Sequence, residues 1–313
     1  MLITNLLFFI ISCLVLIIAG TFLVKSLSKI AEFLGISEFT AAFIIMAIAT
    51  SIPELFVGIS SAILKNPQLS LGNIIGSNIL NLTLITGIIV LVGKEIKLGT
   101  QKISEDIYFM LGAIVLIIFL YLMGKSLSRA DGAILLIFFI LNMYRKFKKK
   151  TKYKAKFKAH VKKWEIILNV SLFIIAFLIL FFSSKYTVKY SSLLAIDLNL
   201  PKIVIGLFLI SFATTLPELV FGVSAIRLDH KEMSIGDQTG TIIANSCLIL
   251  GTVSLIYPIK AEFFQFLISS FFMFISAFIF YTFAKTGKKL ETVEGISLIL
   301  IYVLFVIIEF YIK

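Results

Sequence analysis

The feature that most constrains this chain is a succession of long apolar runs separated by short charged segments. Windows of about 20 residues predict ten transmembrane helices near residues 4–23, 39–64, 70–92, 104–123, 129–144, 165–184, 201–226, 234–257, 262–284 and 292–311. Only 15% of the residues are charged and the mean hydropathy is +1.07. Soluble domains carry about 25% charged residues, so we predict an all-α polytopic membrane protein whose surroundings are the lipid bilayer.

The net charge of +12 comes almost entirely from one segment, residues 145–163, which hold 11 Lys or Arg and no acid. We interpret this segment as a topology determinant that lies against anionic headgroups, and not as a nucleic-acid-binding region. If it is cytoplasmic, that side of the membrane receives 21 of the 29 basic residues. The sequence therefore predicts a plasma-membrane protein with a cytoplasmic 145–163 loop and both termini outside the cell.

An internal repeat relates the two halves of the sequence. Residues 49–87 and 213–251 align at a constant offset of 164 without a gap, and 16 of the 39 aligned positions are identical. The identical positions include Thr50/Thr214, Pro53/Pro217, Glu54/Glu218, Gly58/Gly222, Gly72/Gly236, Gly76/Gly240 and Asn81/Asn245. Shared apolar composition would not align such residues, so the repeat indicates a duplication.

The two repeats are predicted to enter the membrane from opposite sides, because they begin in the second and the seventh predicted spans. Inverted-topology repeats are the architecture of many secondary transporters, whose substrate sites lie near the membrane midplane. We therefore divide the chain into a first five-helix half at 1–144 with its repeat at 39–92, a basic loop at 145–164, and a second five-helix half at 165–313 with its repeat at 201–257.

Two acids, Glu54 and Glu218, fall deep inside predicted spans at matching positions of the repeats. A carboxylate at this depth is costly, and the basic residues are all predicted in loops or at helix ends. Either the two acids share protons or a bound cation neutralises them, and we favour the cation.

The residues around the two glutamates indicate which cation. Pro53 and Pro217 disturb their helices and free carbonyl oxygens one turn earlier. Hydroxyl and amide oxygens recur at repeat-related positions, namely Thr50, Ser51, Ser77, Asn81, Thr214, Thr215, Thr241 and Asn245, and the glycines of both repeats would let these helices approach closely. An all-oxygen ligand set favours hard cations such as Ca²⁺ and Na⁺ over Zn²⁺ or copper.

The pair ATSIPEL (49–55) and ATTLPEL (213–219), each followed by a glycine-containing helix, resembles the α-repeats of the cation/calcium exchanger superfamily, and in particular the prokaryotic sodium/calcium exchangers. The resemblance covers the whole chain. It implies Ca²⁺/Na⁺ antiport by alternating access without a cofactor, with a Ca²⁺ site formed by Glu54, Glu218, Thr50 and Thr214. It also implies two flanking Na⁺ sites, one formed by Ala47, Ser51 and Ser77 and the other by Ser211, Thr215 and Thr241, with Asn81 and Asn245 lining the centre.

Two positions depart from the pattern of this family. Its members often carry a third acid at the position of Asn245, and they usually carry asparagine at the position of Asp237. Asp237 is predicted a few residues inside the span 234–257, near the cytoplasmic face, as either a solvated interfacial acid or a residue of the ion access path. With two midplane carboxylates, charge balance favours exchange of one Ca²⁺ for two monovalent ions.

Other functions remain to be distinguished. An H⁺-coupled exchanger of Ca²⁺ or another divalent cation would use the same fold and the same glutamates. A cation channel would also place acids at the midplane, although inverted repeats usually serve alternating access. An ATP-driven pump is excluded by motif, because Phe119 stands where a phosphate-binding loop ending at Gly124-Lys125-Ser126 requires glycine. We expect no enzymatic activity, inorganic cations as ligands, and a functional monomer.

Overall fold

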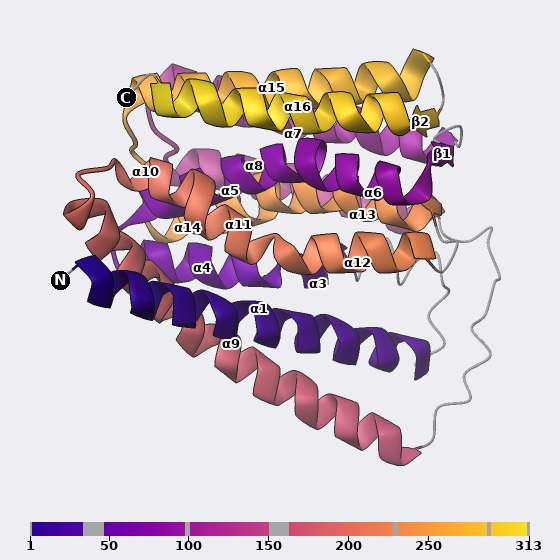
Figure 1. Cartoon of the computed structure of the whole chain (residues 1–313), viewed down its shortest axis with the longest axis horizontal. Coiled ribbons are helices and arrows are strands. Elements are labelled where there is room, and N and C mark those ends of the chain that lie inside the picture. Colours follow the sequence, from indigo (N-terminus) through magenta and orange to yellow (C-terminus); the bar gives the residue numbers. More distant parts are fainter. Residues whose placement is uncertain are drawn as a thin grey trace.

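The computed structural model of the chain describes residues 2–33, 47–97, 101–149, 163–227, 231–286 and 289–311, and it is mostly helical (Figure 1). The α-helices are α1 (Leu2–Phe33), α3 (Ala47–Thr50), α4 (Ile52–Ile63), α5 (Pro67–Leu80), α6 (Thr86–Gly93), α7 (Gln101–Gly124), α8 (Arg129–Lys149), α9 (Lys163–Asp197), α10 (Lys202–Ile205), α11 (Ser211–Thr214), α12 (Leu216–Arg227), α13 (Lys231–Ile243), α14 (Leu250–Ile256), α15 (Phe263–Thr286) and α16 (Thr292–Tyr311). Three π-helical turns join some of them, η2 (Asn81–Ile85), η4 (Gly206–Ile210) and η5 (Ala244–Ile249).

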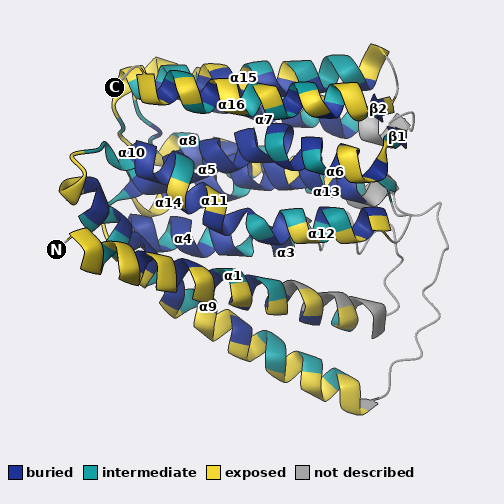
Figure 2. Cartoon of the chain, in the orientation of Figure 1, coloured by how far each residue is buried: buried dark blue, intermediate teal, exposed yellow. Residues whose placement is uncertain are grey.

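The helices form an inner, mostly buried group between outer, more exposed helices, with α1 and α9 on one side and α15 and α16 on the other (Figure 2). Within an apolar 18-residue stretch of the inner spans Pro67–Gly93 and Ser234–Ile256, 83% and 78% of the residues are buried, whereas the value for such a stretch of Trp164–Asp197 is 17%. The outer helices nevertheless expose large apolar side chains such as Phe22, Phe182 and Leu300. Apolar exteriors around a partly polar interior are what a lipid environment requires.

Seven of the described helical segments are long and apolar enough to cross a membrane, or eight if the bent pair α10–α12 counts as one. The expected count of ten is not reached for two reasons. The N-terminal part of the predicted span 39–64 lies outside the described residues. The apolar stretch of α8 is bounded by Asp131 and Arg145 and is short of membrane-spanning length. The ten-span count stays a prediction.

Helix ends differ from the predicted boundaries in two places. The predicted span 165–184 lies within α9, a single helix of 35 residues. The basic segment predicted to begin at residue 145 starts inside α8, which continues to Lys149. Because a helix can extend beyond the membrane, an apolar run indicates where the membrane-spanning part lies but not where the helix ends.

Two helical segments are broken at repeat-related positions, at Ser51 between α3 and α4 and at Thr215 between α11 and α12. Each break is followed by a proline at the second position of the next helix, Pro53 or Pro217. Proline has no amide N–H, and its ring displaces the carbonyl four residues earlier, so the regular hydrogen-bond ladder cannot continue. At the second break the helix bends by 40°.

The other two inner segments are also alike. Helices α5 and α6 are joined by η2, which begins at Asn81, and α13 and α14 are joined by η5, which contains the repeat-related Asn245. In Figure 1, α3 and α4 run in the opposite direction to α11 and α12. The duplicated sequence segments therefore have the same local structure and cross the bundle in opposite directions.

The connections at each end of the bundle contact one another. Strands β1 (Glu95–Lys97) and β2 (Lys289–Glu291) form an antiparallel pair, and Lys231 Nζ donates to the Gly93 and Glu95 carbonyls at 3.0 Å. At the other end Leu127 pairs with Ile259 in a β-bridge. Both chain termini lie at one end of the bundle and α9 begins at the opposite end (Figure 1).

The small sheet is a correction to the all-α prediction. Its strands have three residues each and come from loops far apart in the sequence. The central residues Ile96 and Leu290 face each other and are fully buried. Strands of three residues are too short to show the alternation of apolar and polar residues that predicts a strand. Their pairing arises only when the folded helices bring the two loops together.

Three glycines bring two inner helices into backbone contact. A Cβ atom at Gly72 would lie 2.1 Å from the Ile203 carbonyl oxygen, and one at Gly76 would lie 2.2 Å from the Leu207 carbonyl oxygen. A Cβ at Gly206, on the other side, would lie 2.5 Å from the Leu69 carbonyl oxygen. The backbone of α5 therefore lies so close to α10 and η4 that any side chain larger than glycine would clash at these positions. This close approach is what the sequence predicts for the first repeat.

We expect Gly76→Ala to destabilise the protein, because α5 and η4 must separate to admit the methyl group. Overpacking of this kind typically costs about 1–3 kcal/mol. The control is Gly124→Ala, where the nearest atom to the added methyl is Ser126 Oγ at 3.7 Å. Thermal unfolding of the detergent-solubilised protein should give a lower Tm for Gly76→Ala only, and equal Tm values would contradict the close contact.

Candidate ion-binding site

The two glutamates predicted from the sequence occupy equivalent structural positions. Glu54 lies in the first turn of α4 and Glu218 in the first turn of α12, each directly after a helix break. Both side chains are fully buried. The partial positive charge at a helix N-terminus favours a carboxylate in the first turn, so each break provides a position where an acid is tolerated in the interior. Helix α1 covers both breaks, since a Cβ at Gly20 would lie 3.0 Å from Pro53 Cγ and 3.4 Å from Pro217 Cγ.

The carboxylates of Glu54 and Glu218 have no hydrogen-bond partner on any of their four oxygens. The negative charges of the two groups act on each other. Within the described part of the chain, the ion pairs involve other acids only. A buried charge left without a counter-charge is strongly destabilising, so these two groups require protons or a cation.

Every other predicted site residue whose side chain is described lies in the interior; these are Thr50, Ser51, Ser77, Asn81, Ser211, Thr214, Thr215, Thr241 and Asn245. Ala47 begins α3, and its side chain is outside the described set. The described side chains are therefore buried, as positions inside spans require. Which ion each residue binds stays a prediction.

The hydroxyl groups make contacts that cross from one repeat to the other. The Thr215 and Ser77 hydroxyl oxygens are 3.0 Å apart, and those of Thr50 and Thr241 are 3.2 Å apart. The family resemblance assigns Ser77 and Thr215 to different flanking sites, but the structure places them in contact. The polar region is thus built by both repeats together and does not separate into one set of oxygens per repeat.

Two asparagines of the site were not singled out from the sequence. Asn73 accepts a hydrogen bond from Thr214 Oγ1 at 3.1 Å. Asn78 accepts one from Asn245 Nδ2 at 3.3 Å and donates one to Ser246 Oγ at 3.0 Å. A signal was available, because Asn73 lies one helical turn before Ser77 and therefore on the same face of α5.

The structure corrects the predicted position of Asp237. Helix α13 begins at Lys231, so Asp237 lies six residues, about 9 Å, from its start. Its side chain is fully buried, and Thr50 Oγ1 donates to Asp237 Oδ1 at 3.5 Å. The interpretation as a solvated interfacial acid is wrong, because α13 starts earlier and packs against α3 and α7. Asp237 is therefore a third buried acid of the inner helices, in addition to the predicted Glu54 and Glu218.

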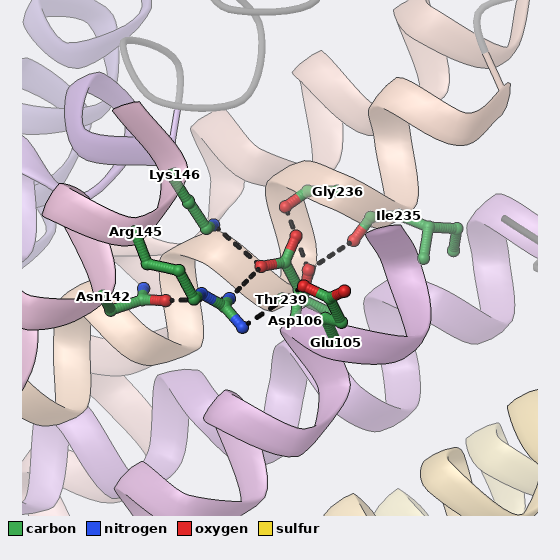
Figure 3. Close-up of polar contacts among 8 residues, drawn as sticks. All are labelled: Glu105, Asp106, Asn142, Arg145, Lys146, Ile235, Gly236 and Thr239. Carbon is green, nitrogen blue, oxygen red and sulfur yellow. Dashed lines mark hydrogen bonds and ion pairs between the residues drawn. The ribbon is translucent and has the colours of Figure 1, made fainter. Parts of the chain in front are cut away.

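A separate charged cluster joins the ends of α7 and α8 beside α13 (Figure 3). Arg145 lies 3.5 Å from Glu105 and 3.2 Å from Asp106, and Lys146 lies 3.3 Å from Asp106. Arg145 also stacks 3.6 Å from the centroid of the Phe109 ring. Two acids balance two bases here, so the cluster neutralises itself and fixes the first residues of the basic segment as part of α8.

The donor set of the central region suits hard cations. It contains carboxylate, hydroxyl and amide oxygens and no thiol or imidazole, and the free thiols of Cys13 and Cys247 are buried in the apolar helices. Among the described residues, no group of three or more His, Cys, Asp or Glu side chains is close enough to hold one metal ion. A central ion would therefore receive at most two carboxylates and complete its coordination with neutral oxygens, as Ca²⁺ and Na⁺ do.

Comparison with known proteins identifies similar chains. A family model described as "Sodium/calcium exchanger protein" matches residues 4–148 and 168–311. The chain is 29% identical to the sodium/calcium exchanger MaX1 of Methanosarcina acetivorans, with 100% of both chains covered. It is 26% identical to the membrane protein MJ0091 of Methanocaldococcus jannaschii over 97% of each chain.

The fold is similar to that of a solved transporter. A structure of the sodium-calcium exchanger NCX_Mj, soaked with Na⁺ and Sr²⁺, superposes on this chain with a TM-score of 0.68. The two sequences are 26% identical, and the alignment covers 98% of this chain and 99% of the other. The similarity therefore includes both repeats and the outer helices.

Proposed function

Because this chain belongs to the sodium/calcium exchanger family, we propose that it carries Ca²⁺ across the membrane in exchange for Na⁺. It is an integral membrane transporter and not an enzyme. The observation that carries the proposal is the pair of fully buried carboxylates, Glu54 and Glu218, with four oxygens that no protein group satisfies. The names of its relatives MaX1 and NCX_Mj support Na⁺ as the coupling ion.

In this proposal Glu54 and Glu218 bind Ca²⁺ as the two anionic ligands. The two negative charges match the charge of the ion, and in a region of low dielectric constant this match dominates the binding free energy. Thr50 and Thr214 would supply neutral oxygens from the residues next to the two helix breaks. Thr214 is also a polar neighbour of the Glu54 carboxylate, which supports its place in the same site.

Na⁺ would occupy the same polar region when Ca²⁺ leaves. The cross-repeat hydroxyl pairs Ser77–Thr215 and Thr50–Thr241 supply neutral oxygens on either side of the glutamates, and the remaining predicted residues line the region between them. Since Na⁺ and Ca²⁺ would share both glutamates, they compete, and one ion species must leave before the other binds.

Alternating access would follow from the inverted relation of the two repeats. In an inverted-repeat transporter the two halves can exchange conformations, so that a fixed midplane site opens to one side and then to the other. The matching breaks of α3–α4 and α11–α12 and their opposite directions (Figure 1) support this mechanism. We propose ten membrane spans arranged as two five-helix halves, with the chain acting as a monomer.

Ion fluxes in proteoliposomes test this function. Vesicles loaded with Na⁺ and diluted into Na⁺-free buffer should take up ⁴⁵Ca²⁺, and vesicles loaded with choline should not. Uptake driven by a pH gradient alone would instead identify an H⁺-coupled exchanger. Uptake that follows membrane potential without any counter-gradient would identify a channel and contradict exchange.

We expect Glu54→Gln and Glu218→Gln each to reduce Na⁺-driven ⁴⁵Ca²⁺ uptake to the level of empty vesicles. Either change leaves half of the charge of the ion uncompensated in a site of low dielectric constant. Glu262→Gln, which neutralises an exposed acid at the start of α15, is the matched control and should transport normally. Thermal unfolding checks that the variants fold, and near-normal uptake by either site variant would contradict the assignment.

We also propose that the 145–163 segment is cytoplasmic and that both termini are outside the cell. The charge of the segment supports this orientation. The test uses a variant in which Cys13 and Cys247 are replaced and one cysteine is introduced, by Lys156→Cys or by Glu262→Cys. An impermeant maleimide should label Glu262→Cys in intact cells and Lys156→Cys only after permeabilisation. The opposite pattern would reverse the orientation.

A further inference from the structure

We propose that Asp237, with the hydroxyl groups of Thr50 and Thr241, forms an additional Na⁺ site beside the glutamate pair. This inference rests on the proposed Na⁺/Ca²⁺ exchange and specifies a ligand for one more Na⁺. Asp237 comes from α13, Thr241 lies one turn later on the same face, and Thr50 ends α3. Both repeats therefore contribute oxygens to this site.

The geometry of the three side chains fits a single cation. Thr50 Oγ1 is 3.5 Å from Asp237 Oδ1 and 3.2 Å from Thr241 Oγ1, and all three residues are fully buried. Oxygens bound at right angles to an ion with metal–oxygen distances near that of Ca²⁺ lie about 3.4 Å apart. Na⁺ has almost the same ionic radius, so these spacings suit it without rearrangement.

Asp237 also requires a counter-charge. Its second oxygen, Oδ2, is buried and has no hydrogen-bond partner. None of the ion pairs found in the described residues involves it, and the bases beside α13, Arg145 and Lys146, are balanced by Glu105 and Asp106 (Figure 3). A carboxylate buried in this way requires either a proton or a cation beside it, and the hydroxyl oxygens of Thr50 and Thr241 next to it favour the cation.

Asp237 is close to the Ca²⁺ site but is not part of it. Its charge acts on Glu218, as the charge of Glu54 does. The three carboxylates nevertheless do not form a group that could hold one common metal ion. In the Na⁺-loaded state three monovalent ions balance the three carboxylates, so charge balance places one Na⁺ at Asp237. This Na⁺ leaves with the other two when Ca²⁺ binds, and a proton then neutralises Asp237.

The first repeat provides a natural comparison. Its equivalent residue, Asn73, accepts a hydrogen bond from Thr214 as Asp237 does from Thr50. The two positions make matching threonine contacts, but one bears an amide and the other a carboxylate. The additional site therefore exists in the second repeat only. A neutral amide cannot provide the negative charge that offsets the cost of moving Na⁺ into an interior of low dielectric constant.

The test counts the Na⁺ ions that compete with one Ca²⁺. Equilibrium ⁴⁵Ca²⁺ binding to purified protein is titrated with Na⁺ at constant pH, and the steepness is bounded by the number of competing ions. We expect a Hill coefficient approaching about three for the natural protein and about two for Asp237→Asn. Glu262→Gln should keep the natural value, and the double variant Asp237→Asn/Asn73→Asp should restore it by moving the charge to the other repeat.

The outcomes separate this inference from the proposed function. If Na⁺ does not displace Ca²⁺ from the natural protein, Na⁺/Ca²⁺ exchange itself fails. If it does, and Asp237→Asn retains the same steepness, only the Asp237 site is overturned. The titration is repeated at several pH values. If Asp237→Asn removes the pH dependence of ⁴⁵Ca²⁺ binding but keeps the Na⁺ steepness, Asp237 is a proton site and the inference is overturned.

A second variant keeps the test decisive if Asp237→Asn does not fold. Thr241→Val removes one proposed ligand and retains the charge, so we expect weaker competition by Na⁺ with little change in Ca²⁺ affinity. Loss of Ca²⁺ binding with this variant would place Thr241 in the Ca²⁺ site and contradict a separate Na⁺ site.

Discussion

The structure depends on one electrostatic constraint, which is the burial of carboxylates that have no basic partner among the described side chains. Glu54, Glu218 and Asp237 are all excluded from solvent. Within the lipid-facing bundle such charges need a proton or a cation, and in the proposed function the interior supplies oxygen ligands for cations. The polar faces of α5 and α13 and the breaks before α4 and α12 all serve this requirement.

The helix breaks make backbone groups available in the interior, which a continuous helix cannot do. An unbroken helix satisfies its own carbonyls and presents only side chains to an ion. The prolines at positions 53 and 217 interrupt the backbone ladder directly before each glutamate, so that a helix N-terminus faces the interior. The glycine contacts between α5 and η4 then bring the two repeats close enough for their hydroxyl groups to touch. Site geometry and helix packing are thus set by the same short segments.

The two halves of the site are alike in shape but differ in charge. The threonine–asparagine contact in one half corresponds to the threonine–aspartate contact in the other. A duplicated fold provides equal positions, and a single substitution at one of them changes how many positive charges the interior accepts. In the proposed exchange, the number of acids in the interior, and not the fold, would limit how many ions the protein holds at once.

Much of this description followed from the sequence. The apolar runs predicted a membrane protein, and the aligned Pro-Glu motifs predicted two equivalent acids beside helix breaks, because proline and a buried carboxylate act through local chemistry. The surrounding hydroxyls and amides were predicted for the same reason.

Tertiary structure alone decided which oxygens meet and which acids are buried. Asp237 lies in a polar stretch, KEMSIGDQTG, which resembles an interfacial segment until α13 is packed against α3 and α7. The contact between Ser77 and Thr215, the pairing of β1 with β2, and the balance of Arg145 and Lys146 by two acids all join residues distant in the sequence. A sequence specifies which groups need a partner, but the partner itself is chosen by packing, since contact energies fall off within a few ångströms.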